Sequence, residues 1–197
     1  GMQSNNGGWG SFDCDNTFSY LNKIPFADHG ALLDPPTVDV TARCLSFLAQ
    51  LNNSNDIEEI KKATRYILSE QEKDGSWFGR WGTNYIYGTW SALSALSLVD
   101  FKDKDKVFNL ATNFLKTKQR NDGGWGEDGA TYDLAYKDLA KASTPSQTAW
   151  AILGLISAGQ IHSKSVKEGI SYLANLFSKK RRWEEKYYTA VGFPKVF

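Results

Sequence analysis

The sequence contains few of the residues that bind metals or form disulfides. Its 197 residues include only two cysteines, Cys14 and Cys44, and two histidines, His29 and His162. These four residues do not follow the ligand spacing of a zinc site. No signal-peptide pattern opens the chain. We therefore expect no metal ion and a reduced compartment inside the cell.

Long apolar runs and an excess of charge of one sign are also missing. No run approaches the roughly 20 consecutive apolar residues that span a bilayer, which leaves monotopic attachment to a membrane open. The 23 basic and 22 acidic residues give a net charge of +1, which argues against a nucleic-acid partner held through its phosphates. With 41% hydrophobic and 14% aromatic residues, the chain is nevertheless long enough for one globular domain, residues 1–197.

A short turn of the form Q-x-x-x-G-x-W occurs three times. The copies begin at Gln3, Gln71 and Gln119 and end at Trp9, Trp77 and Trp125. A fourth copy keeps Trp183 but has Phe177 and Arg181 in place of the glutamine and the glycine. In the last three copies an apolar residue lies four positions before the glutamine position. This spacing indicates that a helix ends in each of these turns.

Hydrophobic periodicity predicts six helices. They are expected over residues 38–51, 57 to at least 67, 90–99, 104–118, 145–158 and 165–178. The first carries an apolar stripe at helical spacing, made by Val40, Cys44, Phe47, Leu48 and Leu51. Capping pairs are expected at three of the starts: Asp56 with Glu59, Thr144 with Gln147, and Ser165 with Glu168.

The helices alternate along the chain between mostly apolar and amphipathic ones. A helix that is apolar all round is buried, whereas a helix with one apolar face lies at the surface. Three inner and three outer helices in alternation are typical of an α/α toroid or solenoid. We therefore predict an all-α protein that forms part of an α/α toroid. The long aromatic loops before the later inner helices are expected to lie at one end of it and to line a cavity.

The repeated turn is expected to hold neighbouring repeats together. The glutamine amide can bond to unpaired backbone groups at the end of a neighbouring helix, the glycine permits a positive φ, and the tryptophan can cover the amide. Exposed tryptophans that stack on sugars are the alternative. The recurrence of each tryptophan next to a helix argues against that carbohydrate-binding function.

The repeated turn resembles the QW motif of the squalene–hopene and oxidosqualene cyclases. Longer stretches look like bacterial squalene–hopene cyclases, in the family's order and over essentially the whole chain: "GMQSNNGGWGSFDCDN", "DPPTVDVTARCL", "GSWFGRWGTNYIYGTW", "GGWGED" and "STPSQTAWA". The resemblance implies a class II terpene cyclase, which protonates squalene with a strong acid and guides carbocations through an aromatic cavity. It implies no cofactor. It also implies peripheral or monotopic attachment to the cytoplasmic side of the inner membrane.

The resemblance assigns two polar residues to the support of the catalytic acid. Asp39 and Arg43 lie four positions apart on the first inner helix, and they match family positions that hydrogen-bond to the acid. Well-studied members have histidine where this chain has Arg43. An ordinary ion pair between residues i and i+4 is the alternative interpretation.

The resemblance also assigns aromatic residues to the substrate cavity. Phe12 and Trp81 match cavity positions that line the path of the cation. Phe193 and Phe197 match two phenylalanines that stabilise later cations, and Phe26 matches a constriction between the membrane-facing channel and the cavity. A π face stabilises a desolvated cation by about 2 kcal/mol. Packing in the core is the alternative for each of them.

The family's protonating motif, D-x-D-D, does not occur in this sequence. In the family it precedes the turn with which this chain begins, and six helices are half of the twelve in a full toroid. We therefore expect a fragment that is inactive alone and that self-associates, or associates with the missing half, through its open flanks. Two alternatives are a toroid with another chemistry, such as a zinc-dependent prenyltransferase subunit, and a non-catalytic binding or structural module. A class I terpene synthase is disfavoured because the magnesium-binding D-D-x-x-D box is absent.

Overall fold

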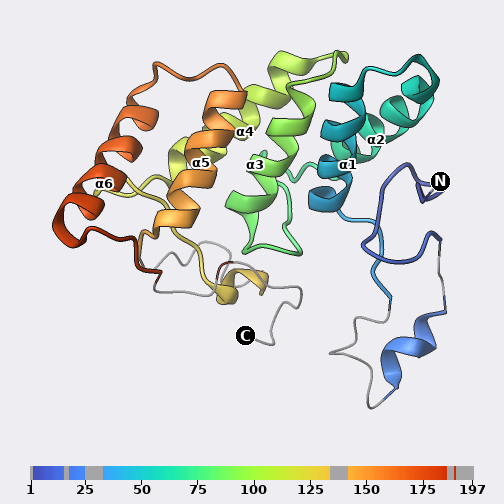
Figure 1. Cartoon of the computed structure of the whole chain (residues 1–197), viewed down its shortest axis with the longest axis horizontal. Coiled ribbons are helices and arrows are strands. Elements are labelled where there is room, and N and C mark those ends of the chain that lie inside the picture. The colour runs from blue at the N-terminus through green and yellow to red at the C-terminus, as the bar shows by residue number, and fades with distance from the viewer. Residues whose placement is uncertain (1, 16–17, 25–32, 134–141, 186–188, 190–197) are drawn as a thin grey trace.

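Figure 1 shows a computed structural model of the chain, in which residues 2–15, 18–24, 33–133, 142–185 and 189 are described. The helices are α1 (Val38–Leu51), α2 (Ile57–Ser69), α3 (Tyr85–Leu96), α4 (Lys104–Lys118), α5 (Pro145–Ser157) and α6 (Lys164–Lys180). Short 3₁₀ helices are η1 (Ser19–Lys23), η3 (Ser54–Asp56) and η4 (Gly129–Tyr132). Within these ranges, extended pairing is limited to the isolated bridges Trp9–Thr37 and Trp125–Thr144. The predicted all-α class is confirmed.

The six helices form two layers. In the inner layer α3 packs between α1 and α5 (Figure 1). The outer helices cover this layer: α2 packs on α1, α4 on both α3 and α5, and α6 on α5. Ten of the twelve residues of α3 are buried, as expected for the central helix of an inner layer. The alternation predicted from the sequence is therefore the alternation of the α/α toroid.

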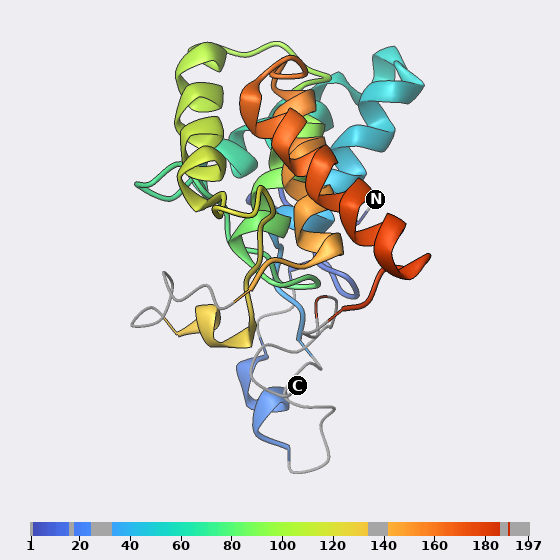
Figure 2. The same cartoon turned by 90° about the vertical axis from the view of Figure 1, so that its left-hand side faces the viewer.

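The loops that precede the inner helices lie at one end of these layers. In both views η1 and η4 lie below the helices, where α1, α3 and α5 begin (Figures 1 and 2). The outer helices run in the opposite direction and end there. The repeated turns and the loops that follow them are thus gathered at the same end.

Two predicted helix starts and one predicted cap differ from those in the structure. Helix α3 begins at Tyr85 rather than Trp90, because Glu127 from a later loop accepts hydrogen bonds from the amides at its start. Ser163, not Ser165, caps α6 by accepting from the amide of Val166. The side chain of Asp56 makes no capping bond to α2, so the predicted capping box there is wrong. The expected cap of α5 is present, since the Thr144 side chain accepts from the amide of Gln147.

The apolar stripe of α1 is only partly covered: Val40, Cys44 and Leu48 are half-buried. Val38, Ala42 and Leu45 face the core and are at most 4% exposed. From the stripe, Phe47 is 61% and Leu51 56% exposed. Helices α2 and α3 cover two sides of α1, and the stripe lies on a side that they leave open. In the described part of the chain, no helix combines the length and the apolar character needed to cross a membrane.

Each glutamine of the repeated turn bonds to the following outer helix. Nε2 of Gln71 donates to the carbonyl of Gly75 at 3.1 Å and to that of Val107, in the first turn of α4, at 3.2 Å. The other copies repeat this pair: Gln3 donates to Gly7 and Glu59 of α2, and Gln119 to Gly123 and Ser165 of α6. Unpaired helix carbonyls occur in the last turn of a helix, not the first. The glutamines were expected to bond to unpaired groups at a helix end, but their acceptors are carbonyls near the start of the following outer helix.

The tryptophans are the residues that bond to carbonyls at helix ends. Nε1 of Trp77 donates to the carbonyl of Ile67 in α2 at 2.7 Å, and Nε1 of Trp125 to that of Leu115 in α4 at 2.6 Å. Both indoles are fully buried. Each bonds to a carbonyl in the last four residues of a helix, where the regular helical donors run out; the Ile67 carbonyl also accepts from the amide of Glu70, at 3.3 Å. Two rings buried in this way cannot stack on a sugar.

The same turn also reaches the following inner helix. The backbone amides of the three tryptophans donate to threonine hydroxyls: Trp9 to Thr41 of α1, Trp77 to Thr89 of α3, and Trp125 to Thr148 of α5. Gly75 has a φ of +90°, and a Cβ there would lie 2.5 Å from the backbone of Leu110. The turn therefore joins three helices and requires glycine where it touches the next outer helix.

The fourth copy of the turn keeps only part of this arrangement. Position 177 lies inside α6 and is phenylalanine, which has no amide side chain. Arg181 adopts the positive φ, +57°, that glycine has in the other copies. Nε1 of Trp183 still donates to Leu173, at 3.3 Å, although the ring is 56% exposed. The bond to the preceding helix is thus independent of the glutamine.

Candidate active site

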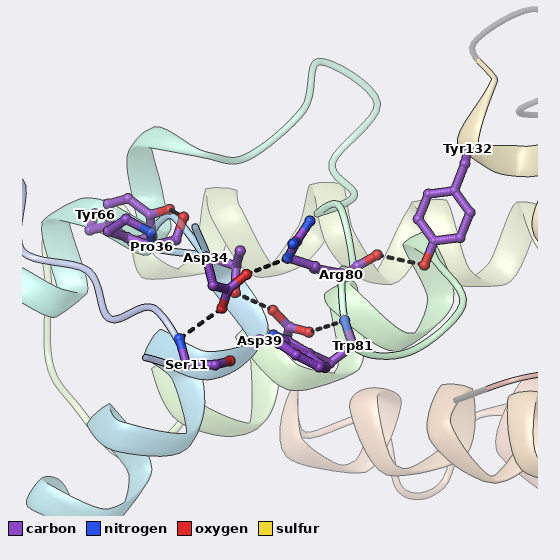
Figure 3. Close-up of polar contacts among 10 residues, drawn as sticks. Ser11, Asp34, Pro36, Asp39, Tyr66, Arg80, Trp81 and Tyr132 are labelled. Atoms are coloured by element: carbon purple, nitrogen blue, oxygen red, sulfur yellow. Dashed lines mark hydrogen bonds and ion pairs between the residues drawn. The ribbon is translucent and has the colours of Figure 1, made fainter. Parts of the chain in front are cut away.

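Two buried carboxylates lie where α1 meets the loop before α3. Asp39, in the first turn of α1, is 1% exposed. Its Oδ1 accepts from the Thr37 hydroxyl at 2.6 Å and its Oδ2 from the amide of Trp81 at 2.7 Å (Figure 3). Both oxygens therefore act as acceptors, and Asp39 connects the start of α1 to the loop of the next repeat.

Asp34, the second buried carboxylate, pairs with the guanidinium of Arg80. Its side chain is buried and forms an ion pair with Nε of Arg80, and its Oδ2 accepts from the amide of Ser11 at 2.7 Å (Figure 3). Sequence reasoning missed this pair. Two features of the sequence could have indicated this pair: Asp34 directly precedes two prolines, and Arg80 directly precedes Trp81. A buried ion pair needs such additional hydrogen bonds to offset the loss of hydration.

Arg43 does not pair with Asp39. Among the described residues, which include both, no hydrogen bond or ion pair joins the two. The guanidinium of Arg43 instead lies over the ring of Trp90, 4.9 Å from its centroid. The i,i+4 ion pair that the sequence allowed is therefore not formed, and Arg43 is directed along the inner layer toward α3.

Three aromatic residues form a cluster beside Arg43. Trp90 of α3 stacks on Trp150 of α5, with centroids 5.9 Å apart and planes 7° apart, and Tyr87 meets both edge-on. Burial raises the pKa of Tyr87, and Asp39 raises it further, while Arg43 acts in the opposite direction. Sequence reasoning missed this cluster because its members come from two helices that are adjacent only in the folded chain.

Phe12 and Trp81 are brought together. Their centroids are 6.2 Å apart, and their planes cross at 81°. Phe12 is 48% exposed, and Trp81 is half-buried. Arg80 also lies near the Trp81 ring, with its guanidinium carbon 5.9 Å from the centroid. The aromatic pair and the Asp34–Arg80 ion pair thus share one loop. The remaining predicted cavity residues, Phe26, Phe193 and Phe197, lie outside the described residues.

The tyrosines around this loop are uncharged at neutral pH. Burial raises the pKa of Tyr85 to about 12, and nearby Glu72, Glu127 and Asp74 add to this effect. Burial also raises the pKa of Tyr132 far above its usual range. Such phenols donate hydrogen bonds without carrying a charge at neutral pH. Among the described residues, no group of three or more His, Cys, Asp or Glu side chains is placed to hold a metal ion.

Known proteins resemble this chain over its whole length. The sequence model of the family described as squalene-hopene cyclase C-terminal domain matches residues 1–197. A squalene–hopene cyclase from Zymomonas mobilis is 54% identical over 198 residues, and one from Alicyclobacillus acidocaldarius is 45% identical over 198 residues. Each match covers 100% of this chain but only 30% and 31%, respectively, of those relatives. The chain thus spans about a third of the length of the curated relatives it matches.

A solved structure has the same fold. The ent-copalyl diphosphate synthase from Streptomyces platensis superposes with a TM-score of 0.60, over 82% of this chain and 30% of that one. At 17% sequence identity, this likeness shows the fold alone. The family match rests on the sequence, which carries the repeated turns and the loop motifs in one continuous match. This chain belongs to the squalene–hopene cyclase family, where it corresponds to the C-terminal domain.

Proposed function

We propose that this chain is part of a cyclase that converts squalene into pentacyclic triterpenes by protonation and carbocation cyclisation. The proposal rests on one observation: at the loop that carries Trp81, buried carboxylates lie next to aromatic rings. Asp39 holds the amide of Trp81 at 2.7 Å, and the Trp81 ring contacts Phe12. Family membership over the whole chain supports the same reaction.

The proposed roles follow from the chemistry of these groups. Aromatic faces stabilise a passing cation and have no lone pair that could trap it, so Phe12 and Trp81 would line its path. Phe26, Phe193 and Phe197 would extend this lining. Asp39 and Arg43 would support the acid through hydrogen bonds and charge, because a nearby cation lowers the pKa of a carboxylic acid. Arg43 would do so from its position over Trp90.

We also propose that the chain alone does not start this reaction. Protonation of an isolated alkene needs a very strong acid, and the D-x-D-D motif that supplies it in the family is absent from this sequence. The described acids Asp34 and Asp39 are engaged as acceptors. The acid would therefore have to come from another segment.

The test is squalene turnover in detergent micelles, with products identified by gas chromatography and mass spectrometry. The chain would be assayed alone and mixed with the N-terminal part of a related cyclase that carries D-x-D-D. We expect polycyclic product only in the mixture, and a loss of product with Asp39→Asn but not with Asp56→Asn, whose side chain makes no capping bond. Product from the chain alone would contradict the assignment of the acid. No product in either assay would favour a non-catalytic module.

We further propose that the chain self-associates through the open flanks of its helical layers. Phe47 and Leu51 are exposed on α1 at one flank, and Ile170 (52% exposed) and Trp183 on and after α6 at the other. Apolar surface of this kind tends to mark an interface. Light scattering across a wide concentration range should show a mass that rises with concentration, and a Phe47→Ser, Leu51→Ser variant should reduce that rise. A constant monomer mass would contradict the proposal.

A further inference from the structure

The segment that carries Arg80 and Trp81 is irregular up to the start of α3, and side chains bond to its backbone at several points. It runs from Gly79 to Ile86, into the first turn of α3. The bonds come from side chains of five residues in several parts of the chain: Asp39, Asn84, Glu127, Tyr132 and Gln147. Buried backbone groups outside regular structure need such partners. Here the partners also determine where the loop lies.

Glu127 holds the end of this segment from the loop of the next repeat. Its side chain is buried, and its Oε2 accepts from the amides of Asn84, at 3.1 Å, and Ile86, at 2.8 Å. These amides lie at the start of α3, where the first N–H groups have no helical acceptor, and a negative charge is favoured there. Asn84 makes no capping bond of its own, because its Oδ1 accepts from the amide of Gly79 instead.

Tyr132 closes the other part of the segment. Its hydroxyl lies 2.9 Å from the carbonyl of Gly79 and 3.0 Å from that of Gly82. Figure 3 shows Tyr132 directed at the loop beside Arg80. These two carbonyls flank Arg80 and Trp81, so one phenol proton is shared between the two ends of the short loop. The Tyr132 ring also meets Phe78 edge-on, with centroids 5.5 Å apart. The hydroxyl is thus directed at the loop by the packing of its own ring.

We propose that Glu127 and Tyr132 are positioning residues, which fix the Trp81 ring against Phe12 by holding the backbone on both sides of it. Trp81 is half-buried and Phe12 is 48% exposed, so the bonds to the backbone on both sides of Trp81 add to what ring packing contributes. The consequence for cyclisation rests on the function proposed above. The positioning itself concerns only the folded chain and can be measured without any activity. A ring that guides a cation must be held in place by such supporting contacts.

The test compares Tyr132→Phe with Tyr172→Phe in the full chain. Tyr172 is the matched control, because its hydroxyl also donates to a backbone carbonyl, that of Ser143, at 3.0 Å, but in a different loop. The chain would be labelled with 5-fluorotryptophan, and the Trp81 signal assigned with Trp81→Phe in ¹⁹F NMR. We expect Tyr132→Phe to shift or broaden the Trp81 signal while the other tryptophan signals stay in place. Tyr172→Phe should leave the Trp81 signal unchanged.

Glu127→Gln provides a second variant in case Tyr132→Phe does not fold. It keeps an acceptor oxygen but removes the charge, so we expect the amides of Asn84 and Ile86 to exchange with deuterium about fivefold faster, since hydrogen bonds to charged groups are stronger. The Trp81 signal should move in the same sense as in Tyr132→Phe. If the Trp81 signal is unchanged in every variant that folds, the proposal is wrong.

The cyclisation assay then tests separately what the positioning of Trp81 does for the reaction. In the mixture with the D-x-D-D segment, Tyr132→Phe should raise the share of incompletely cyclised products at least several-fold, and Tyr172→Phe should not. An unchanged product ratio in a variant whose Trp81 signal has shifted would overturn the role in the reaction. If the unmodified chain gives no product, the proposed function fails, while the NMR result still decides the positioning.

Discussion

The amide of Trp81 donates a hydrogen bond of 2.7 Å to Oδ2 of Asp39, although the two residues are 42 positions apart. This bond joins the first turn of one inner helix to the loop that precedes the next. The same carboxylate accepts from Thr37 through its other oxygen. Asp39 therefore bonds both to the residue directly before its own helix and to the aromatic loop of the next repeat.

Replacement of Asp39 should destabilise the fold. Asp39→Ala leaves the Trp81 amide and the Thr37 hydroxyl without their acceptor in a buried site, and we expect it to lower the free energy of unfolding by about 2–4 kcal/mol, because each unsatisfied buried group costs about 1–3 kcal/mol. Asp39→Asn should cost less, since an acceptor oxygen remains. Urea unfolding measures both. An Asp39→Ala variant as stable as the unmodified chain would show that the bonds are not maintained in solution.

Two tryptophans that make the same bond should differ in their contribution to stability. Trp77→Phe removes a fully buried indole donor and leaves the Ile67 carbonyl without it, so it should cost about 2–4 kcal/mol. Trp183 makes the equivalent bond at 3.3 Å but is 56% exposed, and Trp183→Phe should cost less than about 1 kcal/mol. Thermal unfolding monitored by circular dichroism compares the two. Equal losses would contradict this reasoning.

Glycine should be required at the turn and dispensable elsewhere. Gly75 and Gly159 both have a positive φ, but a Cβ at Gly75 would lie 2.5 Å from the Leu110 backbone, whereas a Cβ at Gly159 meets nothing within 4 Å. Gly159→Ala should therefore cost only the left-handed backbone penalty of about 1–2 kcal/mol. Gly75→Ala adds a backbone clash and should cost clearly more. The difference in urea midpoint between the two variants is the measurement, and a smaller loss for Gly75→Ala would contradict it.

Burial of Tyr85 should make stability depend on pH in the alkaline range. Its pKa in the folded chain is raised to about 12, above the unperturbed value of about 10. The unfolded state therefore loses its phenol proton first, and stability falls as the pH rises from about 10 to about 12. Below pH 10 this contribution is fully present. In urea unfolding at a series of pH values, Tyr85→Phe should reduce the slope, whereas Tyr20→Phe, at an exposed position, should leave it unchanged.

Local sequence patterns predicted the helices whose signals are local. The bounds of α1 and α4 and the cap of α5 at Thr144 match the structure, because periodicity and capping act over a few residues. The start of α3 could not be found in this way. Its first amides donate to Glu127, which lies 43 positions from Asn84. Patterns of a few neighbouring residues cannot predict a contact over that separation.

The candidate site was predicted only in part for the same reason. The resemblance singled out Asp39, Phe12 and Trp81, and the structure brings these three together through one hydrogen bond and one ring contact. It gave no indication that Arg43 lies over Trp90, or that Arg80 pairs with Asp34. A long arginine side chain can reach several acids and rings, and the choice among them depends on the packing of the neighbouring helix.

By itself, the sequence determined the all-α class, the alternation of inner and outer helices, the repeated turn and the family. These properties are encoded by periodicity, by glycines where φ is positive, and by motifs of a few residues. Only the tertiary structure decided which carbonyl each turn side chain reaches, which acid holds Arg80, and how Glu127 and Tyr132 hold the Trp81 loop. The physical reason is that buried polar groups must find partners, and those partners become neighbours only when the layers have packed.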